Sequence, residues 1–346
     1  PAVLLYGGSS PPPGVPTGYT LAANSGGPTG DFHSDTWQLI VQSSGGAKYN
    51  ARWVRLSEEG WAAPPARGGH AAASHAHGSC CASLGCMLIF GGLSSTHQPL
   101  SDLWQFCVST GKWVELVPSA AAEAITRIGA RNLWPTYLAD AWPEVVWPTP
   151  RHQHSLTALA AAPSPHLAAN SSAEPGALLL FGGIGGPTAV RDDGLWLYHL
   201  SRGVWLKVHT PAGDARPFAR LGHSALALSP STLYLYGGIG EGEAARGGGI
   251  SLGASPVAAE EPWEFTLPTN LDDVVDACAR CSQHGSCDLS DGRCVCEPPW
   301  GGKQCDSLQP EGVPLAPRRA ISAALWLCGS LVVGTLVGWV CRQRAI

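Results

Sequence analysis

The chain has 346 residues, of which 14% are charged, and it contains 43 Gly and 29 Pro. This composition favours many short strands joined by turns over long helices or a disordered tail. Residues 1–317 hold 17 basic and 26 acidic residues, a net charge of −9, and the other four basic residues flank a C-terminal apolar segment. A net-acidic body without a basic stripe argues against nucleic-acid binding.

One short sequence motif recurs four times: an apolar run, an aromatic residue and two glycines. The copies are LLYGG at 4–8, LIFGG at 88–92, LLLFGG at 178–183 and LYLYGG at 233–238. Arg-x-x-His precedes three copies, and an acidic residue and a Trp follow every copy, with a second Trp after the first three. Repetition in a fixed order predicts a repeated structural unit.

Each unit is predicted to form four strands, one after Arg-x-x-His, one ending at the double glycine and one at each Trp. The double glycine permits positive φ and close backbone approach. The Trp pair is expected to pack between neighbouring sheets. The residues at these repeat positions are Gly7, Gly8, Gly91, Gly92, Gly182, Gly183, Gly237, Gly238, Trp37, Trp53, Trp104, Trp113, Trp196, Trp205, Trp263, Arg67, Arg151, Arg220, His70, His154 and His223.

The aromatic–Gly–Gly word, the Trp pair and the arginine resemble the kelch repeat over roughly residues 1–267. The resemblance implies a mainly β fold, in which four-stranded blades stack radially into a β-propeller. The double glycines are 84, 91 and 55 residues apart, against about 50 for a kelch repeat. We therefore expect insertions near 9–34, 74–83 and 118–149.

Residues 1–270 are expected to form three to four blades, incomplete at the N-terminus. The first unit lacks its opening strand and the last lacks its closing strand. The kelch resemblance implies a closed ring of about six or seven blades. We therefore expect further blades before residue 1, or closure of the ring by another chain. The chain starts at Pro1 without a visible signal peptide, and we expect a processed or truncated start.

Six cysteines lie within residues 278–305, in the spacing C-x2-C-x5-C-x6-C-x-C-x8-C. This density indicates a disulfide framework, because so short a segment has little core of its own. Sequence alone leaves the pairing open. Zinc is the competing interpretation of Cys-x-x-Cys, but no second copy of that motif follows.

The words HGSC at 284–287 and CVCEPPWGGKQC at 294–305 resemble an EGF-like module, which we place at 276–306. The resemblance implies the disulfides Cys278–Cys287, Cys281–Cys294 and Cys296–Cys305. Calcium binding stays open, because LDDVVDAC at 271–278 lacks the usual carboxylate pattern. Cys80, Cys81, Cys86 and Cys107 form one or two further disulfides or remain buried thiols.

Residues 320–341 carry no charge and are long enough, as a helix, to span a membrane. Arginines flank both ends, so the positive-inside rule is nearly tied. Disulfides require an oxidising space, which predicts a type I single span with a Pro-rich stalk at 307–319 and a cytosolic tail at 342–346. A buried core helix and a GPI signal are the alternatives. Asn170 lies in a glycosylation sequon.

No catalytic residue, cofactor or metal site is predicted, and we expect a protein that is not an enzyme. The chain contains no G-x-S-x-G, H-E-x-x-H or phosphate-binding loop. His70, His154 and His223 share one repeat position, which favours a scaffold role. His75 and His77 are one residue apart, without a third ligand nearby in sequence. The alternative is a membrane-tethered copper oxidase, since some kelch-like propellers are such enzymes.

The insertion at 131–150 holds Trp134, Tyr137, Trp142 and Trp147, residue types that dominate contact hot spots. We predict a partner-binding loop there; the alternative is that these aromatics pack on their own blade.

The whole architecture resembles attractin-like surface proteins. It implies a receptor or adhesion protein of the plasma membrane or a secretory-pathway membrane that binds a protein or glycan. The tail is too short for a signalling domain, so signalling would need a lateral membrane partner. A secretory-pathway cargo receptor is the third possibility.

Overall fold

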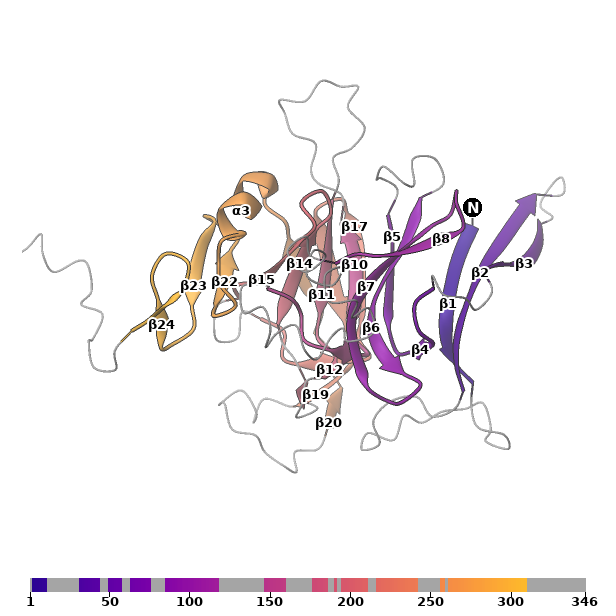
Figure 1. Ribbon diagram of the computed structural model, residues 1–346, viewed down its shortest axis with the longest axis horizontal. Coiled ribbons are helices and arrows are strands. Elements are labelled where there is room, and N and C mark those ends of the chain that lie inside the picture. The colour runs from indigo at the N-terminus through magenta and orange to yellow at the C-terminus, as the bar shows by residue number, and fades with distance from the viewer. Residues whose placement is uncertain are drawn as a thin grey trace, which may run out of the picture. The chain divides into compact units, whose positions relative to one another are not determined.

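The structure, a computed structural model, divides into two units, Pro1–Ser307 and Leu308–Ile346. It describes residues 2–10, 31–43, 49–57, 63–75, 85–117, 146–159, 176–185, 190–191, 194–210, 216–241, 256–258 and 261–309. In the first unit four antiparallel sheets follow one another in chain order, and we call them blades 1 to 4 (Figure 1).

Blade 1 is a three-stranded sheet in the order β1 (Ala2–Ser9), β2 (Phe32–Ser43) and β3 (Tyr49–Ser57). The first double glycine lies near the end of β1, where the register with β2 shifts between Tyr6 and Gly8. Glycine suits such an irregular position because it has no Cβ. Blade 1 thus has the second, third and fourth strands that the repeat predicts.

Blade 2 is built on β5 (Ala71–His75), β6 (Cys86–Ser94), β7 (Pro99–Cys107) and β8 (Lys112–Glu115), in that order. The two-residue strand β4 (Arg67–Gly68) pairs with the end of β6 beyond its double glycine. Blade 2 therefore shows the complete four-stranded unit predicted from the repeat.

Blade 3 contains β10 (Ser155–Leu159), β11 (Ala177–Phe181), β14 (Leu195–His199) and β15 (Val204–Val208). A tight turn precedes β15, with Gly203 at φ +65°, a conformation that glycine adopts without steric cost.

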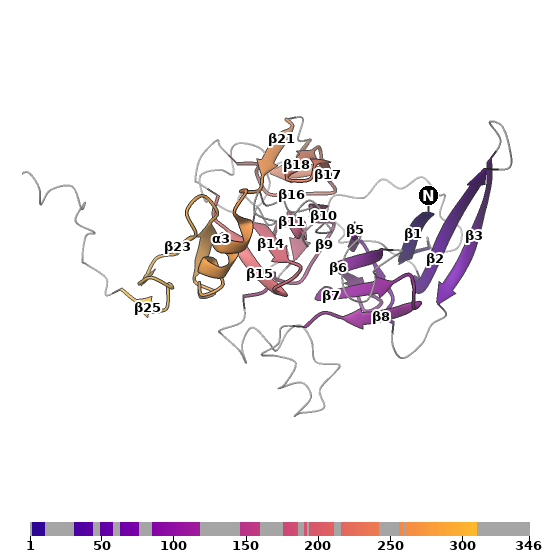
Figure 2. The ribbon, with the colours of Figure 1, turned by 90° about the horizontal axis from the view of Figure 1, so that it is seen from above.

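Blade 4 has three strands, β17 (Ser224–Ser229), β18 (Thr232–Tyr236) and β21 (Trp263–Thr266). The first strands of blades 2, 3 and 4 lie side by side, because β10 contacts both β5 and β17 (Figure 2). The sheets thus form a four-blade, propeller-like arrangement.

Two small sheets repeat the pairing of β4 with β6 in blades 3 and 4. In each of them the Arg-x-x-His segment pairs with the residues that follow the double glycine. Their strands are β9 (Arg151–His152), β12 (Ile184–Gly185) and β13 (Val190–Arg191), and β16 (Arg220–Leu221), β19 (Ile239–Glu241) and β20 (Pro256–Ala258).

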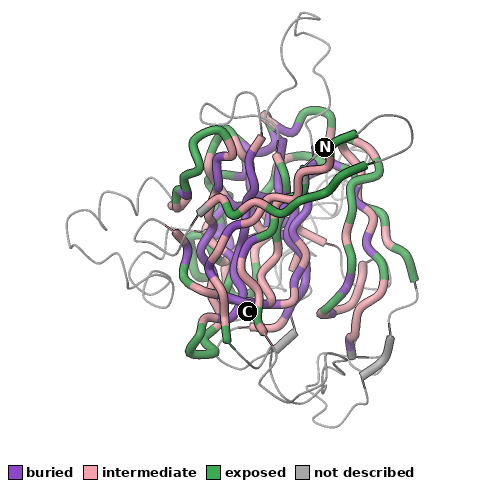
Figure 3. The backbone as a smooth tube through the Cα atoms, turned by 90° about the vertical axis from the view of Figure 1, so that its right-hand side faces the viewer, coloured by how far each residue is buried: buried purple, intermediate pink, exposed green. Residues whose placement is uncertain are grey.

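The cores lie between blades, because alternate residues of each second strand face opposite neighbours. In β6, Met87 and Ile89 join the cluster shared with blade 1, whereas Leu88 and Phe90 join the cluster shared with blade 3. The same alternation makes all of β11 buried, and Figure 3 shows the buried stretches running along the strands. A strand that is buried on both faces has consecutive apolar residues, which explains the apolar run in the recurring motif.

The cysteine-rich segment begins with α3 (Leu271–Cys278) and continues with β22 (Gly285–Asp288) and β23 (Arg293–Cys296). Two short strands follow, β24 (Trp300–Gly301) and β25 (Ser307–Leu308). β22 pairs in parallel with β15, so blade 3 and the β22–β23 hairpin share one six-stranded sheet. Strands from the two predicted domains, 1–270 and 276–306, therefore pair in one sheet.

Within the residues that the structure describes, no helix has the length and apolarity needed to cross a membrane. The predicted span at 320–341, the tail, most of the stalk and Asn170 lie outside those residues. Cys80, Cys81 and His77 lie outside them too.

Candidate functional site

The histidines of the Arg-x-x-His repeats lie at the blade interfaces. Each ring packs edge-on against the aromatic residue that precedes the double glycine in the preceding blade. The ring centroids are 5.7 Å apart for Tyr6 and His70, 5.5 Å for Phe90 and His154, and 5.4 Å for Phe181 and His223. Such aromatic pairs are worth about 0.5–1.5 kcal/mol beyond their buried area. Each histidine therefore holds its blade to the blade before it.

The two glycines of a repeat are needed for different reasons. A Cβ on Gly91 would lie 2.5 Å from the carbonyl oxygen of Arg151 in the next blade. A Cβ on Gly92 would lie 2.9 Å from the Cβ of His70 in the same blade. Both glycines have positive φ, at 62° and 99°. The first glycine thus admits the neighbouring blade, and the second admits the histidine of its own blade.

The repeat arginines are fully buried and tie backbone segments together. Each donates from Nη1 to the carbonyl of the first glycine of its own blade, and from Nε to the carbonyl two residues before itself. The distances are 2.9 and 3.1 Å for Arg67, 3.1 and 3.0 Å for Arg151, and 3.1 and 3.2 Å for Arg220. Hydrogen bonds from a charged donor contribute about 1.5–3 kcal/mol each. The arginine therefore fixes where the chain enters each blade.

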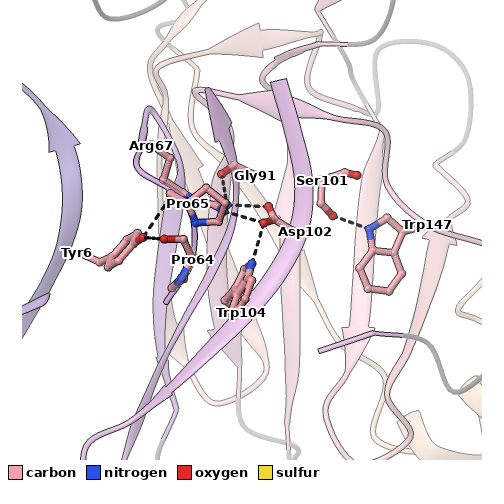
Figure 4. A network of polar contacts seen from close by, with 9 residues as sticks. All are labelled: Tyr6, Pro64, Pro65, Arg67, Gly91, Ser101, Asp102, Trp104 and Trp147. Carbon is pink, nitrogen blue, oxygen red and sulfur yellow. Dashed lines mark hydrogen bonds and ion pairs between the residues drawn. The ribbon is translucent and has the colours of Figure 1, made fainter. Parts of the chain in front are cut away.

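Arg67 has an acidic partner as well (Figure 4). Its Nη1 and Nη2 each lie 2.6 Å from a carboxylate oxygen of Asp102, and the indole Nε1 of Trp104 donates to the same carboxylate at 2.7 Å. Burial alone would lower the pKa of Arg67, but the charge and hydrogen bonds of Asp102 raise it, with a net shift upward. The acidic residue and the first Trp of the repeat thus belong to one buried network.

Blade 4 has the repeat arginine, Arg220, but among the described residues no carboxylate binds it as Asp102 binds Arg67. The Nη2 of Arg220 is buried and has no hydrogen-bond partner among the described residues. Burial lowers the pKa of Arg220. Glu261 takes the place of Asp102 in the repeat, two residues before Trp263, and is exposed. The electrostatic network is therefore complete in blade 2 and incomplete in blade 4.

The second Trp of a unit packs onto the preceding blade. The indole of Trp113 lies 4.7 Å from the ring of Tyr6 and donates to Thr36 Oγ1 at 3.0 Å. Trp205 lies 5.4 Å from Phe90. The prediction that Trp side chains pack between sheets therefore holds for these two residues.

The outer faces of blades 1 and 4 break this pattern, because no described blade covers them. Tyr236 is 58% exposed, although Phe90 at the same repeat position is fully buried. A Cβ on Gly237 would meet no atom within 4 Å. On blade 1, Trp53 is 50% exposed, whereas Trp113 is buried. The prediction of an interblade position is thus not met at Trp53.

A pocket of about 180 Å³ opens between blades 3 and 4. Its lining is mainly apolar and includes Leu233, Leu235 and Trp263. The full lining is Phe181, Leu195, His209, Thr210, Arg216, Pro217, Leu233, Leu235, Trp263, Glu264 and Phe265. The indole Nε1 of Trp263 is buried without a hydrogen-bond partner among the described residues. An apolar side chain flanked by a polar group would suit such a pocket.

Residues 67–119 match the Kelch motif family. The matched segment starts at Arg67 and spans the strands of blade 2. The Arg–glycine contact and the histidine–aromatic contact recur in blades 3 and 4, so these blades share the kelch geometry. A search of curated proteins found no match to the chain.

Of the predicted contact residues, only Trp147 lies in the described part of the chain. Its Nε1 donates to the carbonyl of Ser101 at 2.6 Å (Figure 4). Its ring lies 6.0 Å from that of Trp205. Trp147 therefore packs between two kelch blades, as the alternative interpretation of this loop expects. Trp134, Tyr137 and Trp142 lie outside the described residues.

The kelch histidines are buried and hold low pKa values. Burial lowers the pKa of His70, His152 and His223 to about 4 in each case. Burial, as the largest cause, and the charge of Arg151 lower the pKa of His154 well below its ordinary value. No group of three or more metal-ligating side chains converges in the part of the chain that the structure describes. The contacts of these histidines are those of interblade packing.

Three disulfides cross-link the segment after blade 4: Cys278–Cys287, Cys281–Cys294 and Cys296–Cys305. These are the pairs that the EGF-like resemblance implies.

The disulfide-rich segment is also fastened to blade 3. The N–H of His209 donates to the Cys287 carbonyl at 2.7 Å. Arg202 donates two hydrogen bonds to Asp276, at 2.8 and 3.0 Å. Hydrogen bonding to Arg202 lowers the pKa of Asp276. The acidic segment before Cys278 thus contacts blade 3 through Asp276.

Sequence reasoning missed the pocket and this junction. The pocket residues Arg216 and Glu264 come from separate segments without a shared motif, and nothing in their sequence brings them together. The repeat itself offered one signal for the blade interfaces, because a His precedes three of the four double glycines at the same position of the repeat.

Proposed function

We propose that this chain is the ectodomain and anchor of a single-pass type I membrane protein that binds a protein partner through its kelch blades. The pocket between blades 3 and 4 is the observation that carries the proposal. Binding hot spots are commonly a buried aromatic or aliphatic anchor in a pocket with a polar rim. The apolar wall of this pocket favours a protein side chain over a sugar.

The three disulfides support an oxidising compartment, since cytosolic thiols are kept reduced. An EGF-like identity of the disulfide-rich segment rests on its cysteine spacing and its disulfide pairs. The uncharged stretch 320–341 supports a membrane anchor. Together these features support the proposal that the kelch blades lie outside the cytosol.

Site-specific photo-crosslinking in living cells tests the binding surface. A benzophenone amino acid replaces Arg216, a partly exposed residue that lines the pocket, in the full-length chain. The control places the same group at Val114, which is 51% exposed on blade 2. We expect a discrete adduct of higher mass only from position 216, and we expect Thr210→Trp, which fills the pocket, to abolish it. Equal adducts at both positions, or none at 216, would contradict the proposal.

Protease treatment of intact cells tests the membrane arrangement separately. With a tag on the C-terminus, a surface receptor leaves only a short tagged fragment. A tagged chain that stays intact until the cells are opened would favour the cargo-receptor alternative in an internal compartment.

A further inference from the structure

Cys86 and Cys107 lie directly opposite each other in blade 2. Cys86 begins β6, Cys107 ends β7, and the antiparallel register makes them Cα partners. The N–H of Val108 donates to the carbonyl of Gly85 at 3.5 Å, so the adjacent residue pair is a hydrogen-bonded one. Cys86 and Cys107 therefore form a non-hydrogen-bonded pair, in which opposite side chains come closest.

This pair matches the geometry that a disulfide needs. Opposite residues in a non-hydrogen-bonded pair have Cα atoms about 4.5 Å apart, and disulfides span Cα distances of about 4.4–6.8 Å. Both side chains point to the same face of the sheet, because both belong to the core cluster shared with blade 3. Each residue is only 3% exposed, which shields a bond there from reductants.

We propose that Cys86 and Cys107 form a cross-strand disulfide during folding in the secretory pathway. The structure shows no S–S bond between these two residues. The Cys86 sulfur lies 3.3 Å from the His75 carbonyl, and the Cys107 sulfur lies 3.2 Å from Ser109 Oγ. Rotation of each side chain about χ1 turns the sulfurs toward each other. The proposal concerns a covalent bond and does not depend on partner binding.

The oxidant is a protein disulfide of the thiol–disulfide oxidoreductase class. One cysteine attacks the oxidant disulfide to give a mixed disulfide, and the second cysteine then displaces the oxidant thiol. The chain loses two protons and two electrons and gains one S–S bond, while the oxidant disulfide becomes two thiols. Burial of both sulfurs requires that this exchange occur before blades 2 and 3 close.

The bond would fasten the open end of the β6–β7 hairpin, opposite its turn. The hairpin carries Gly91, which admits the next blade, and Asp102, which binds Arg67. A disulfide that closes this segment stabilises the fold mainly by restricting the unfolded chain. It thus constrains the two strands that contact both neighbouring blades.

The position of the only methionine gives a direct test. The full-length chain is purified from the membranes of secretory cells after thiols are blocked by N-ethylmaleimide in denaturant. Trypsin then releases residues 68–112, which lack internal Lys and Arg, and cyanogen bromide cuts this peptide after Met87. We expect fragments 68–87 and 88–112 to stay joined until a reductant is added.

Variants separate the three possible partners of Cys107 within that peptide. The joined product is expected to persist in the Cys80→Ser/Cys81→Ser variant and to be lost in Cys86→Ser. Tandem mass spectrometry of the joined wild-type fragments identifies which cysteine of residues 68–87 is linked to Cys107, so the assignment does not depend on the folding of Cys86→Ser. Wild-type fragments that separate without reductant, with Cys107 alkylated, would overturn the proposal. So would a link that disappears in the Cys80→Ser/Cys81→Ser variant.

Discussion

Arg67 and Asp102 form a fully buried ion pair in blade 2, with two N–O distances of 2.6 Å. The same arginine binds the carbonyl of Gly91. The carboxylate thus secures an arginine that fixes the start of the blade. Hydrogen bonds from Arg67 to backbone carbonyls and its ion pair with Asp102 therefore stabilise this kelch blade.

Removal of this carboxylate is expected to be costly. Asp102→Ala leaves a buried guanidinium without its counter-charge, which destabilises the fold by about 3–5 kcal/mol. Asp35→Ala is the matched control, because Asp35 accepts the same indole hydrogen bond from Trp37 at 2.7 Å but has no arginine partner among the described residues. That variant should lose only about 1 kcal/mol. Urea unfolding of both variants measures the difference, and equal losses would contradict the role of the ion pair.

The double glycine offers a second matched comparison. Gly91→Ala places a Cβ 2.5 Å from the Arg151 carbonyl oxygen, whereas Gly237→Ala meets no atom within 4 Å. Both glycines have positive φ, 62° and 74°, so each alanine costs about 1–2 kcal/mol of backbone strain. Only Gly91→Ala also separates two blades, and we expect its melting temperature to fall further. If the two variants melt alike, some group absent from the described residues covers Gly237.

The buried histidines predict a loss of stability in mild acid. In the folded chain the pKa is about 4 for His70 and His223, and for His154 it lies well below the ordinary value of about 6.5. Between these values the unfolded chain binds more protons, so the free energy of unfolding falls as pH drops from about 6.5 toward 4. Each histidine contributes a slope of at most about 1.4 kcal/mol per pH unit.

Two substitutions at one ring contact test this origin. His154→Leu removes a titrating group and should flatten the pH dependence of the unfolding free energy. Phe90→Leu disturbs the same interblade contact without removing an ionisable group, and should lower stability while leaving the slope unchanged. A slope that stays the same in His154→Leu would assign the acid sensitivity to other groups.

The tryptophans should differ in proportion to their burial. Trp113→Ala removes a buried ring that packs on Tyr6 and donates to Thr36, which is expected to cost about 3–5 kcal/mol. Trp53 is half exposed in blade 1, so Trp53→Ala should cost far less. Thermal melting of the full-length chain in detergent compares them. A large loss at Trp53 would show that another blade or chain covers that face.

The repeat was readable from sequence because its causes are local and periodic. A strand buried on both faces needs a continuous apolar run, and a close approach of backbone needs glycine, so an apolar run followed by an aromatic residue and two glycines marks each blade. The cysteine spacing likewise indicated a disulfide framework.

Tertiary structure alone decided which segments meet. Nothing in the local sequence shows that His154 packs on Phe90, that β22 extends the sheet of blade 3, or that Arg216 and Leu233 line one pocket. These contacts join residues far apart in the chain, and they depend on the register and stacking of whole sheets. The sequence by itself therefore determined the blades and their repeated residues, while the packing of sheets determined their interfaces, the pocket and the opposition of Cys86 and Cys107.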